Sequence, residues 1–342
     1  MPSQRPGGSG SAWRWLCDQT GTGIAVIELR EIEAARARIA DVAVRTPLVR
    51  LHAAEVPADT EVYLKLEALQ PIGSFKIRGA TNAIRTAPEQ ARRGGLVTAS
   101  AGNMAQGVAW AGRDFGLPAT IAVPDHAPRA KLDAIERLGG RVVKLPYDEW
   151  WQAIVTSRVN GIEGLFVHPV QDEAVMAGNG TIGLEILDDL PDPDAVVIPF
   201  GGGGLTVGIG SAIRAMQPDT KIYTAEPATG AALAGALAAG EPVDVRYTAS
   251  FVDGAGSRRV LDAMWPRLSP LVDGAFAVPI GEAAAAVRLL SARARVVAEG
   301  AGALATAAAL AGQAGSGKVV CIVSGGNIDP AKLADILRGG DS

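Results

Sequence analysis

The chain has 342 residues, of which 48% are apolar and 5% aromatic, with a formal net charge of −4 and a pI near 5.5. This length predicts two domains or one large α/β unit. The absence of a basic block argues against nucleic acid as a partner. No apolar run approaches the ~20 residues of a membrane span. The only two cysteines, Cys17 and Cys321, lie far apart, which is typical of a protein of the reducing cytoplasm.

The first part of the chain predicts a leader, a helix and a strand. Residues 1–22 are rich in Gly and Ser and lack the basic start and long apolar centre of a signal peptide, so we expect a flexible leader. Residues 27–40 have helical spacing with charge on one face, and residues 61–66 alternate like a strand. A further helix is expected to begin near Lys76 and to run to about residue 84.

From residue 95 the pattern becomes strand, glycine turn, helix. Such a βαβαβ block predicts parallel strands with right-handed crossovers, and we assign it to a small substrate-side domain over residues 91–169. The expected strands are 96–99, 119–123 and 141–145, and the expected helices are 104–115 and 130–138.

The same alternation continues to the end of the chain, so the predicted fold class is α/β throughout. Residues 23–90 and 170–342 are assigned to a large cofactor domain, without any break in composition at the boundaries. Its later strands are expected at 195–200, 221–225 and 319–323, and its later helices at 174–187, 205–216, 231–239 and 281–297.

Four corners between a strand and a turn are candidates for chemistry, at residues 73–76, 100–103, 201–204 and 324–327. Ligands of open α/β sheets bind at the carboxyl ends of the strands, where these corners are expected to lie. Lys76 stands out in the first corner because it is flanked by Phe75 and Ile77. Such a lysine either extends along an apolar face or is desolvated, and desolvation lowers its pKa and makes it a nucleophile or base.

The second unusual feature is a run of four glycines, Gly201, Gly202, Gly203 and Gly204, between a buried strand and a helix. Without side chains, their N–H groups can point at one anion, and the helix N-terminus adds partial positive charge. A hinge is the alternative, but the tight frame of strand and helix favours phosphate binding. The three histidines are scattered and no metal-ligand spacing is present, so no metal site is predicted.

Taken together, the corners resemble the four signatures of fold-type II pyridoxal-phosphate enzymes, within the threonine/serine dehydratase and serine racemase branch. The matching segments are Ser74 to Ala80, Ser100 to Asn103, Gly201 to Gly204 and Ser324 to Asn327, in the order of that family. The resemblance covers about residues 27–329. It implies a tryptophan synthase β-like fold of two open, mostly parallel sheets with helices on both faces, and pyridoxal 5'-phosphate as the cofactor.

The resemblance also implies roles for individual residues. Lys76 would hold the cofactor as a Schiff base, Phe75 would pack beside its ring, and Asn103 would donate to its phenolic oxygen. The glycines at 201–204 would hold the phosphate, and Ser324 would face the pyridine nitrogen. The turn of Ser100, Ala101 and Gly102, followed by Asn103 and Met104, would bind the substrate carboxylate. The pocket for the substrate side chain is expected near Val170, Met104 and Asp253-Gly254.

Three positions depart from the pattern of the branch. Ala101 stands where its racemases carry a serine that acts on the opposite face of the carbanion, and an alanine cannot deliver a proton. Met104 stands where a histidine is usual, so a polar group is lost near the substrate. Glu226 begins the divalent-cation site of the branch, but Ala232 occupies the place of a carboxylate ligand. Elimination is therefore favoured over racemisation, and no tight metal site is expected.

These features predict a cytoplasmic ammonia-lyase that converts a small β-hydroxy amino acid, such as threonine or serine, to a 2-oxo acid and ammonia. Lys76 would act as the base that removes the α-proton. One alternative is a racemase or a β-replacement enzyme on the same scaffold, and another is a pyridoxal-phosphate-binding protein without turnover. The expected partner is a small amino acid, with no nucleic acid and no membrane, and the family implies a homodimer.

Overall fold

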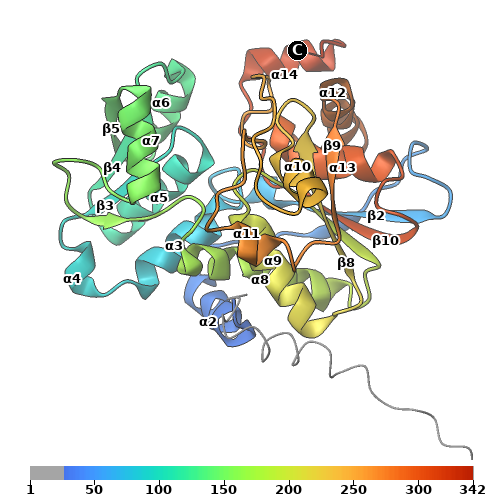
Figure 1. Ribbon diagram of the computed structural model, residues 1–342, viewed down its shortest axis with the longest axis horizontal. Helices are drawn as coiled ribbons and strands as arrows, with labels where there is room; N and C mark the ends of the chain where they lie inside the picture. The colour runs from blue at the N-terminus through green and yellow to red at the C-terminus, as the bar shows by residue number, and fades with distance from the viewer. Residues whose placement is uncertain (1–26, 342) are drawn as a thin grey trace, which may run out of the picture.

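The structure is a computed structural model that describes residues 27–341, and within them the chain forms two β-sheets surrounded by helices (Figure 1). The predicted leader at residues 1–22 lies outside the described residues. The predicted α/β class is confirmed. The assignment of residues 91–169 to one domain and the remainder to another stays a prediction, although the four strands of the smaller sheet fall between residues 96 and 166.

The larger sheet has six strands, all parallel except for the antiparallel pair at one edge. Val319 pairs with Val62 on one side and with Ala195 on the other, which places the last strand of the chain inside the sheet. In sheet order the strands are β1 (Leu48–Arg50), β2 (Thr60–Lys65), β10 (Gly317–Ile322), β7 (Ala195–Pro199), β8 (Lys221–Pro227) and β9 (Gly274–Val278).

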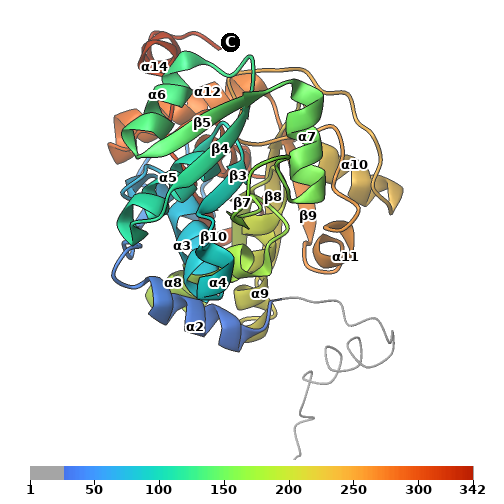
Figure 2. The same ribbon diagram turned by 90° about the vertical axis from the view of Figure 1, so that its left-hand side faces the viewer.

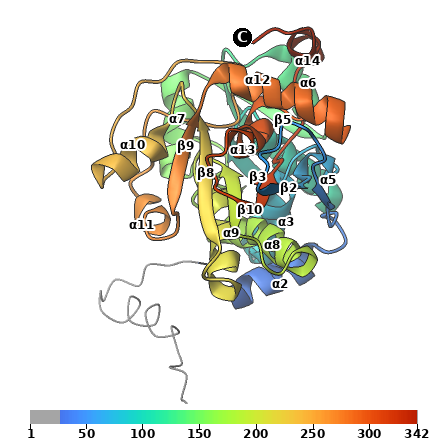
Figure 3. The same cartoon turned by 90° about the vertical axis from the view of Figure 1, so that its right-hand side faces the viewer.

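Both faces of this sheet are covered, as parallel sheets require. Alternate residues of β10 point to opposite faces, so Val319 and Cys321 join one apolar cluster while Val320 and Ile322 join the other. On the first face lie α12 (Ile280–Leu289), α13 (Gly300–Leu310) and α14 (Pro330–Leu337), and on the second lie α2 (Leu29–Ile39), α8 (Glu173–Asp189) and α9 (Gly204–Met216) (Figure 3).

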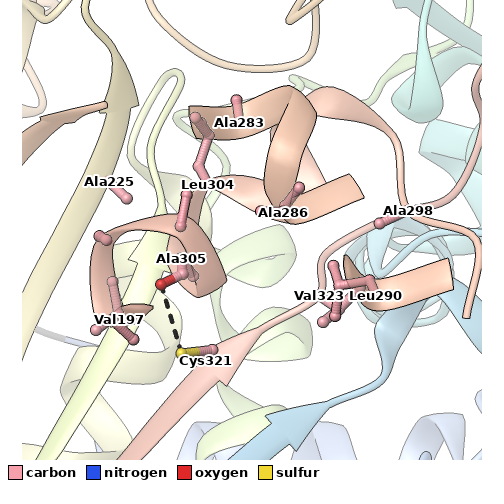
Figure 4. Packing of buried hydrophobic residues seen from close by; sticks show 14 of the residues in the cluster. Val197, Ala225, Ala283, Ala286, Leu290, Ala298, Leu304, Ala305, Cys321 and Val323 are labelled. Carbon is pink, nitrogen blue, oxygen red and sulfur yellow. Dashed lines mark hydrogen bonds between the residues drawn. The ribbon is translucent and has the colours of Figure 1, made fainter. Parts of the chain in front are cut away.

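Small residues allow close packing on the first face (Figure 4). The alanines of α13 lie directly against the strands, and α12 packs on α13. The buried thiol of Cys321 donates to the carbonyl of Ala305. Shorter helices complete the periphery of this sheet: η1 (Glu67–Leu69), α10 (Ala232–Ala239) and α11 (Trp265–Leu268).

The smaller sheet has four parallel strands in the order β5-β4-β3-β6. It lies between α5 on one face and α7 on the other (Figure 2). The bounds are β3 (Leu96–Ala99), β4 (Ala119–Pro124), β5 (Gly140–Leu145) and β6 (Leu165–Phe166), with α4 (Glu89–Arg92), α5 (Asn103–Phe115), α6 (Arg129–Arg137) and α7 (Tyr147–Thr156).

Helix α3 (Lys76–Thr86) packs between α8 and α5 and so joins the two sheets. Glycines make this close packing possible. A Cβ on Gly178 would lie 2.6 Å from the carbonyl oxygen of Arg78, and one on Gly107 would lie 3.2 Å from that of Lys76. The position of the first turn of α3 is therefore set by backbone-to-backbone contact from both sides.

The predicted helix over 281–297 is wrong in its second half. Helix α12 ends at Leu289, a π-helical turn follows over Leu290–Ala294, and Arg295 adopts a left-handed conformation with φ of 60°. This break lets the chain turn back so that α13 can begin at Gly300, directly after Glu299. The need for the turn comes from the tertiary structure, and helical spacing does not encode it. No helix among the described residues is long and apolar enough to cross a membrane.

Candidate functional site

A cavity of about 470 Å³ lies between the two sheets, at the carboxyl ends of their strands. Its size is within the range of sites for small ligands. Every site residue predicted above lines this one cavity: Phe75, Lys76, Ser100, Ala101, Gly102, Asn103, Met104, Gly201, Gly202, Gly203, Gly204 and Ser324. Val170, Asp253 and Gly254, which were predicted near the substrate, line it as well.

Lys76 is the first residue of α3, and the corner before it is tied to the end of β10. Ser74 forms an isolated bridge with Gly325, and the Phe75 N–H donates to the carbonyl of Ser324 at 3.0 Å. The ammonium of Lys76 donates to the Pro169 carbonyl at 3.0 Å and lies 5.0 Å from the centre of the Phe75 ring. Burial lowers the pKa of Lys76 to about 8, so a neutral amine is accessible near physiological pH.

The glycine bend connects β7 to α9, and its shape depends on the absence of side chains. Gly203 has φ of 96°, a conformation that favours glycine. A Cβ on Gly202 would lie 2.3 Å from a methyl group of Val170, and one on Gly204 would lie 2.8 Å from the Val170 carbonyl oxygen. The bend therefore lies flush against residue 170. The first residues of α9 line the cavity, and their N–H groups have no acceptor within the helix. These N–H groups are therefore available to bind an anion.

A second helix N-terminus lines the cavity from the side of the smaller sheet. Helix α5 begins at Asn103 after the turn at Ser100, whose hydroxyl accepts from the N–H of Gly102 at 3.2 Å. A Cβ on Gly102 would meet nothing within 4 Å, so space is open there. Two helix N-termini thus lie at one cavity, which suits a ligand pair with two anionic groups.

Met104 also lines the cavity, but it is 2% exposed and belongs to the apolar cluster between α3, α5 and the smaller sheet. Its thioether offers no strong polar group to a ligand. Ser324, at the end of β10, is 4% exposed, and its hydroxyl makes no hydrogen bond to any of residues 27–341. That hydroxyl is free for a ligand atom.

Sequence reasoning missed a buried carboxyl group in this cavity. Glu299, at the start of α13, is 7% exposed and accepts a hydrogen bond from the Asn103 side-chain amide at 2.7 Å. Burial raises the pKa of Glu299 to about 7, and the nearby Asp253 carboxylate adds to the rise. Asn327, in the last signature segment, donates to the Asn103 side-chain oxygen at 2.8 Å. The contacts join positions about two hundred residues apart, so no local pattern signals them.

Sequence reasoning also missed a buried network of charged side chains around Arg78. Arg78 donates to Glu67 on η1 and to Glu185 on α8, and Lys65 on β2 donates to Glu185 at 2.6 Å. Arg78 holds the pKa of the Glu67 carboxyl below its ordinary value, against the effect of burial. The network ties α3 to three other elements two residues after Lys76. The available signal was Arg78, a second cationic residue in the first turn of a helix that also contains Ile77, Gly79 and Ala80.

Within residues 27–341, no three His, Cys, Asp or Glu side chains gather as a metal-ligand set. The carboxylate of Glu226 accepts instead from the N–H groups of Leu233 and Ala234, at the start of α10. Burial raises the pKa of Glu226 to about 7. His168 is buried and structural: its Nδ1 accepts from two backbone N–H groups, and its Nε2 lies 3.1 Å from the Ile154 carbonyl.

The residues present fit pyridoxal 5'-phosphate. The glycine bend against Val170 leaves backbone donors for a phosphate, and the Lys76 amine is buried yet reaches the same cavity. The Ser324 hydroxyl has no hydrogen-bond partner among residues 27–341. The ring of Phe75 lines the space beside the amine. Each requirement of the cofactor is thus matched by a group that lines this cavity.

Comparison with known proteins agrees with this fit. The family model for pyridoxal-phosphate dependent enzymes matches residues 39–325. An L-threonine ammonia-lyase of Thermotoga maritima is 41% identical over 319 residues, which are 92% of this chain and 79% of that protein. A catabolic L-threonine dehydratase of Staphylococcus aureus is 35% identical over 330 residues, which are 92% of this chain and 93% of that protein.

Solved structures give the same result. Maize serine racemase matches with a TM-score of 0.84 and 31% identity, over 92% of this chain and 98% of that one. Threonine deaminase isoform 2 of Solanum lycopersicum matches with a TM-score of 0.81 and 33% identity, over 91% of this chain and 88% of that one. The predicted fold and cofactor are confirmed. The chain belongs to the pyridoxal-phosphate dependent enzyme family, as a fold-type II lyase of the threonine dehydratase and serine racemase branch.

Proposed function

We propose that this lyase converts threonine, serine or a similarly small β-hydroxy amino acid to a 2-oxo acid and ammonia. The observation that carries the proposal is the buried amine of Lys76, in one cavity with the glycine bend and the N-terminus of α5. Relatives at 35–41% identity are named for threonine ammonia-lyase or dehydratase activity, which supports the choice of substrate.

In this proposal the chain's residues divide into two sets. Lys76 bonds covalently to the cofactor, the N–H groups of Gly201 to Gly204 bind its phosphate, and Phe75 packs beside its ring. Ser324 donates to or accepts from the ring nitrogen, and Asn103 donates to the phenolic oxygen. The second set, Ser100 to Gly102 with the first N–H groups of α5, binds the substrate carboxylate.

When bound, pyridoxal phosphate accepts the electron pair left by removal of the α-proton, which lowers the cost of that step. The Lys76 amine, with its lowered pKa, is suited to take this proton at neutral pH. Ala101 offers no proton donor in the substrate-binding turn. Reprotonation there is disfavoured, so the α-proton and the β-hydroxyl are lost together as one water molecule. One water is lost and one is consumed later, so the amino acid gives a 2-oxo acid and ammonia without net water.

Absorbance and product analysis test the proposal directly. The purified protein should show the visible absorbance of lysine-bound cofactor and should release 2-oxo acid from threonine or serine. Lys76→Ala should abolish both. Lys144→Ala is the matched control, because Lys144 is exposed on β5 and should leave both unchanged. A protein that stays colourless with added pyridoxal phosphate would contradict the proposal.

Racemisation or β-replacement on the same scaffold is the alternative, and the similarity to maize serine racemase favours racemisation among the two. Incubation with L-serine, followed by chiral analysis and oxo-acid assay with and without an added thiol, separates the three reactions. Appearance of D-serine without oxo acid would replace the lyase proposal with the racemase. Cofactor absorbance with no reaction across a broad amino-acid panel would favour a binding protein.

We further propose a homodimer and a cytoplasmic location. The family resemblance supports the dimer, and the scarcity of cysteines supports a reducing compartment. Light scattering of the purified full chain tests the dimer, since a mass of one 35.1 kDa chain would contradict it. Fractionation of the source cells tests the location.

A further inference from the structure

The side-chain amide of Asn103 is held from both sides by residues near the ends of the six-stranded sheet. Its Nδ2 donates to Oε1 of Glu299 at 2.7 Å, and its Oδ1 accepts from Nδ2 of Asn327 at 2.8 Å. Asn327 also donates to the carbonyl of Ile72 at 2.8 Å. Asn103 belongs to α5, so these bonds cross from one sheet system to the other.

The bonds determine which way the Asn103 amide faces. The Ile72 carbonyl can only accept, so the NH₂ group of Asn327 must point toward it and toward Asn103. Asn103 must then present its oxygen to Asn327 and its NH₂ group to Glu299. One N–H of Asn103 is used by Glu299, and the other makes no bond to the described residues. This free N–H belongs to a residue that lines the cavity.

The surroundings of Glu299 hold its side chain in contact with Asn103. Its backbone is fixed, because its N–H donates to the Gly325 carbonyl at 3.0 Å and its own carbonyl accepts from Ala303 in the first turn of α13. The bond from Asn103 is the only side-chain hydrogen bond of Glu299 within residues 27–341. A Cβ on Gly325 would lie 2.4 Å from Oε1, so a glycine is needed there for the carboxyl group to reach Asn103.

We propose that Glu299 is a positioning residue that orients the Asn103 amide, so that the free N–H of Asn103 faces the phenolic oxygen of the cofactor. The inference rests on the proposed role of Asn103 in the cofactor site. It requires an acceptor oxygen at position 299 and does not require a charge. Asn327 contributes to the same orientation by donating a hydrogen bond to the Asn103 side-chain oxygen.

Cofactor binding to the apoprotein tests the inference independently of turnover. Glu299→Gln keeps the acceptor and should bind pyridoxal phosphate within about twofold of the wild type. Glu299→Leu removes the acceptor and should raise the dissociation constant about tenfold, with a shifted visible absorbance band. Asn103→Ala should have a similar effect, and the double variant Asn103→Ala/Glu299→Leu should bind no more weakly than either single variant. Glu282→Gln, an exposed acid on α12, is the control.

A pH titration of the visible band provides a second measurement, which needs only the conservative variant. The wild-type band should shift as Glu299 ionises, at a pH above the ordinary range of a carboxyl group, because burial and the Asp253 carboxylate raise the pKa of Glu299 more than Lys131 lowers it. The shift should vanish in Glu299→Gln. If Glu299→Leu does not fold, as judged from its melting temperature, Glu299→Ala, which also lacks the acceptor oxygen, takes its place in the binding measurement.

Unchanged affinity and an unchanged band in folded Glu299→Leu would overturn the inference, as would equal losses in the Gln and Leu variants. A strictly additive double variant would also overturn it, because Asn103 and Glu299 would then act separately. These outcomes differ from failure of the proposed function, in which the wild-type protein itself binds no pyridoxal phosphate or turns over no amino acid.

Discussion

At the scale of single residues, Lys76 is a lysine whose side chain is removed from water yet reaches an open cavity. Its only hydrogen-bond acceptor among the described residues is the neutral carbonyl of Pro169. No carboxylate compensates its charge there, so burial dominates and the ammonium form is disfavoured. The apolar neighbours of Lys76 in the sequence left open whether it is desolvated or extends along an apolar face, and the structure favours desolvation.

This environment predicts how the apoprotein reacts with an amine reagent. The pKa of Lys76 is lowered to about 8 from an ordinary value near 10.4, so its neutral fraction should rise through pH 8. In competitive labelling with trace acetic anhydride, followed by mass spectrometry, Lys76 should label with a midpoint near 8. A lysine with the ordinary pKa near 10.4 should label with a midpoint about two pH units higher. Equal midpoints would contradict the proposed desolvation.

The same pKa shift has a defined sign in stability. Between about pH 8 and pH 10 the unfolded chain still holds the Lys76 proton that the folded apoprotein has released. The unfolded state therefore binds more protons, and the contribution of Lys76 to the stability of the apoprotein rises with pH in this interval. Below pH 8 the cost of burying the ammonium is present in full.

At the scale of elements, the glycine bend before α9 depends on contact with residue 170. Gly202→Ala should destabilise the protein by about 1–3 kcal/mol, because the new Cβ would overlap Val170, and should weaken pyridoxal-phosphate binding as the bend shifts. Urea unfolding and cofactor titration measure the two effects. Gly281→Ala on α12 is the control, since its Cβ would meet only Asp341 at 3.8 Å. That control should be neutral or stabilising by up to about 1 kcal/mol.

The buried network of Arg78, Glu67, Glu185 and Lys65 predicts a second element-scale result. Glu185→Gln would leave Lys65 and Arg78, which are 0% and 1% exposed, with one carboxylate between them. We expect a loss of about 3–5 kcal/mol in the free energy of unfolding, measured in urea.

A control for this variant lies on the same helix. Asp188 on α8 pairs with Arg36 and Arg45, with its side chain 35% exposed. Asp188→Asn should therefore cost less than about 1 kcal/mol. If Glu185→Gln and Asp188→Asn lowered the free energy of unfolding by similar amounts, burial would not be the reason for the expected effect of Glu185→Gln.

At the scale of the whole molecule, the cavity lies between the two sheets and the helices that pack on each. Among the described residues, one ion pair connects the two sides across the cavity lining. Lys131 on α6 pairs with Asp253, which follows β8 and α10 in the other system. Both residues line the cavity, and their side chains are 33% and 53% exposed. An ion pair of this exposure contributes up to about 1 kcal/mol and is screened by salt.

Removal of this pair should favour a more open cavity. Lys131→Ala is expected to raise KM for the amino-acid substrate about two- to fivefold with little change in kcat. Salt at about 1 M should raise KM of the wild type similarly and add little in the variant. Arg129→Ala is the control, because Arg129 pairs only with Asp133 and Glu136 of its own helix among the described residues. An unchanged KM in Lys131→Ala would contradict a role for the pair in closing the cavity.

The sequence by itself determined the α/β class, most strands and helices, and the motif residues that line the cavity. These features follow from local periodicity and from the position of turns at strand ends. Both signals depend only on residues that are close together in the sequence. The early end of α12, the contact of Glu299 with Asn103 across 196 residues, and the charge network around Arg78 were decided only by tertiary structure. A buried polar group needs a hydrogen-bond partner, and that partner can lie anywhere in the sequence. Which residues become partners depends on which distant segments the fold brings into contact, and local spacing does not encode this.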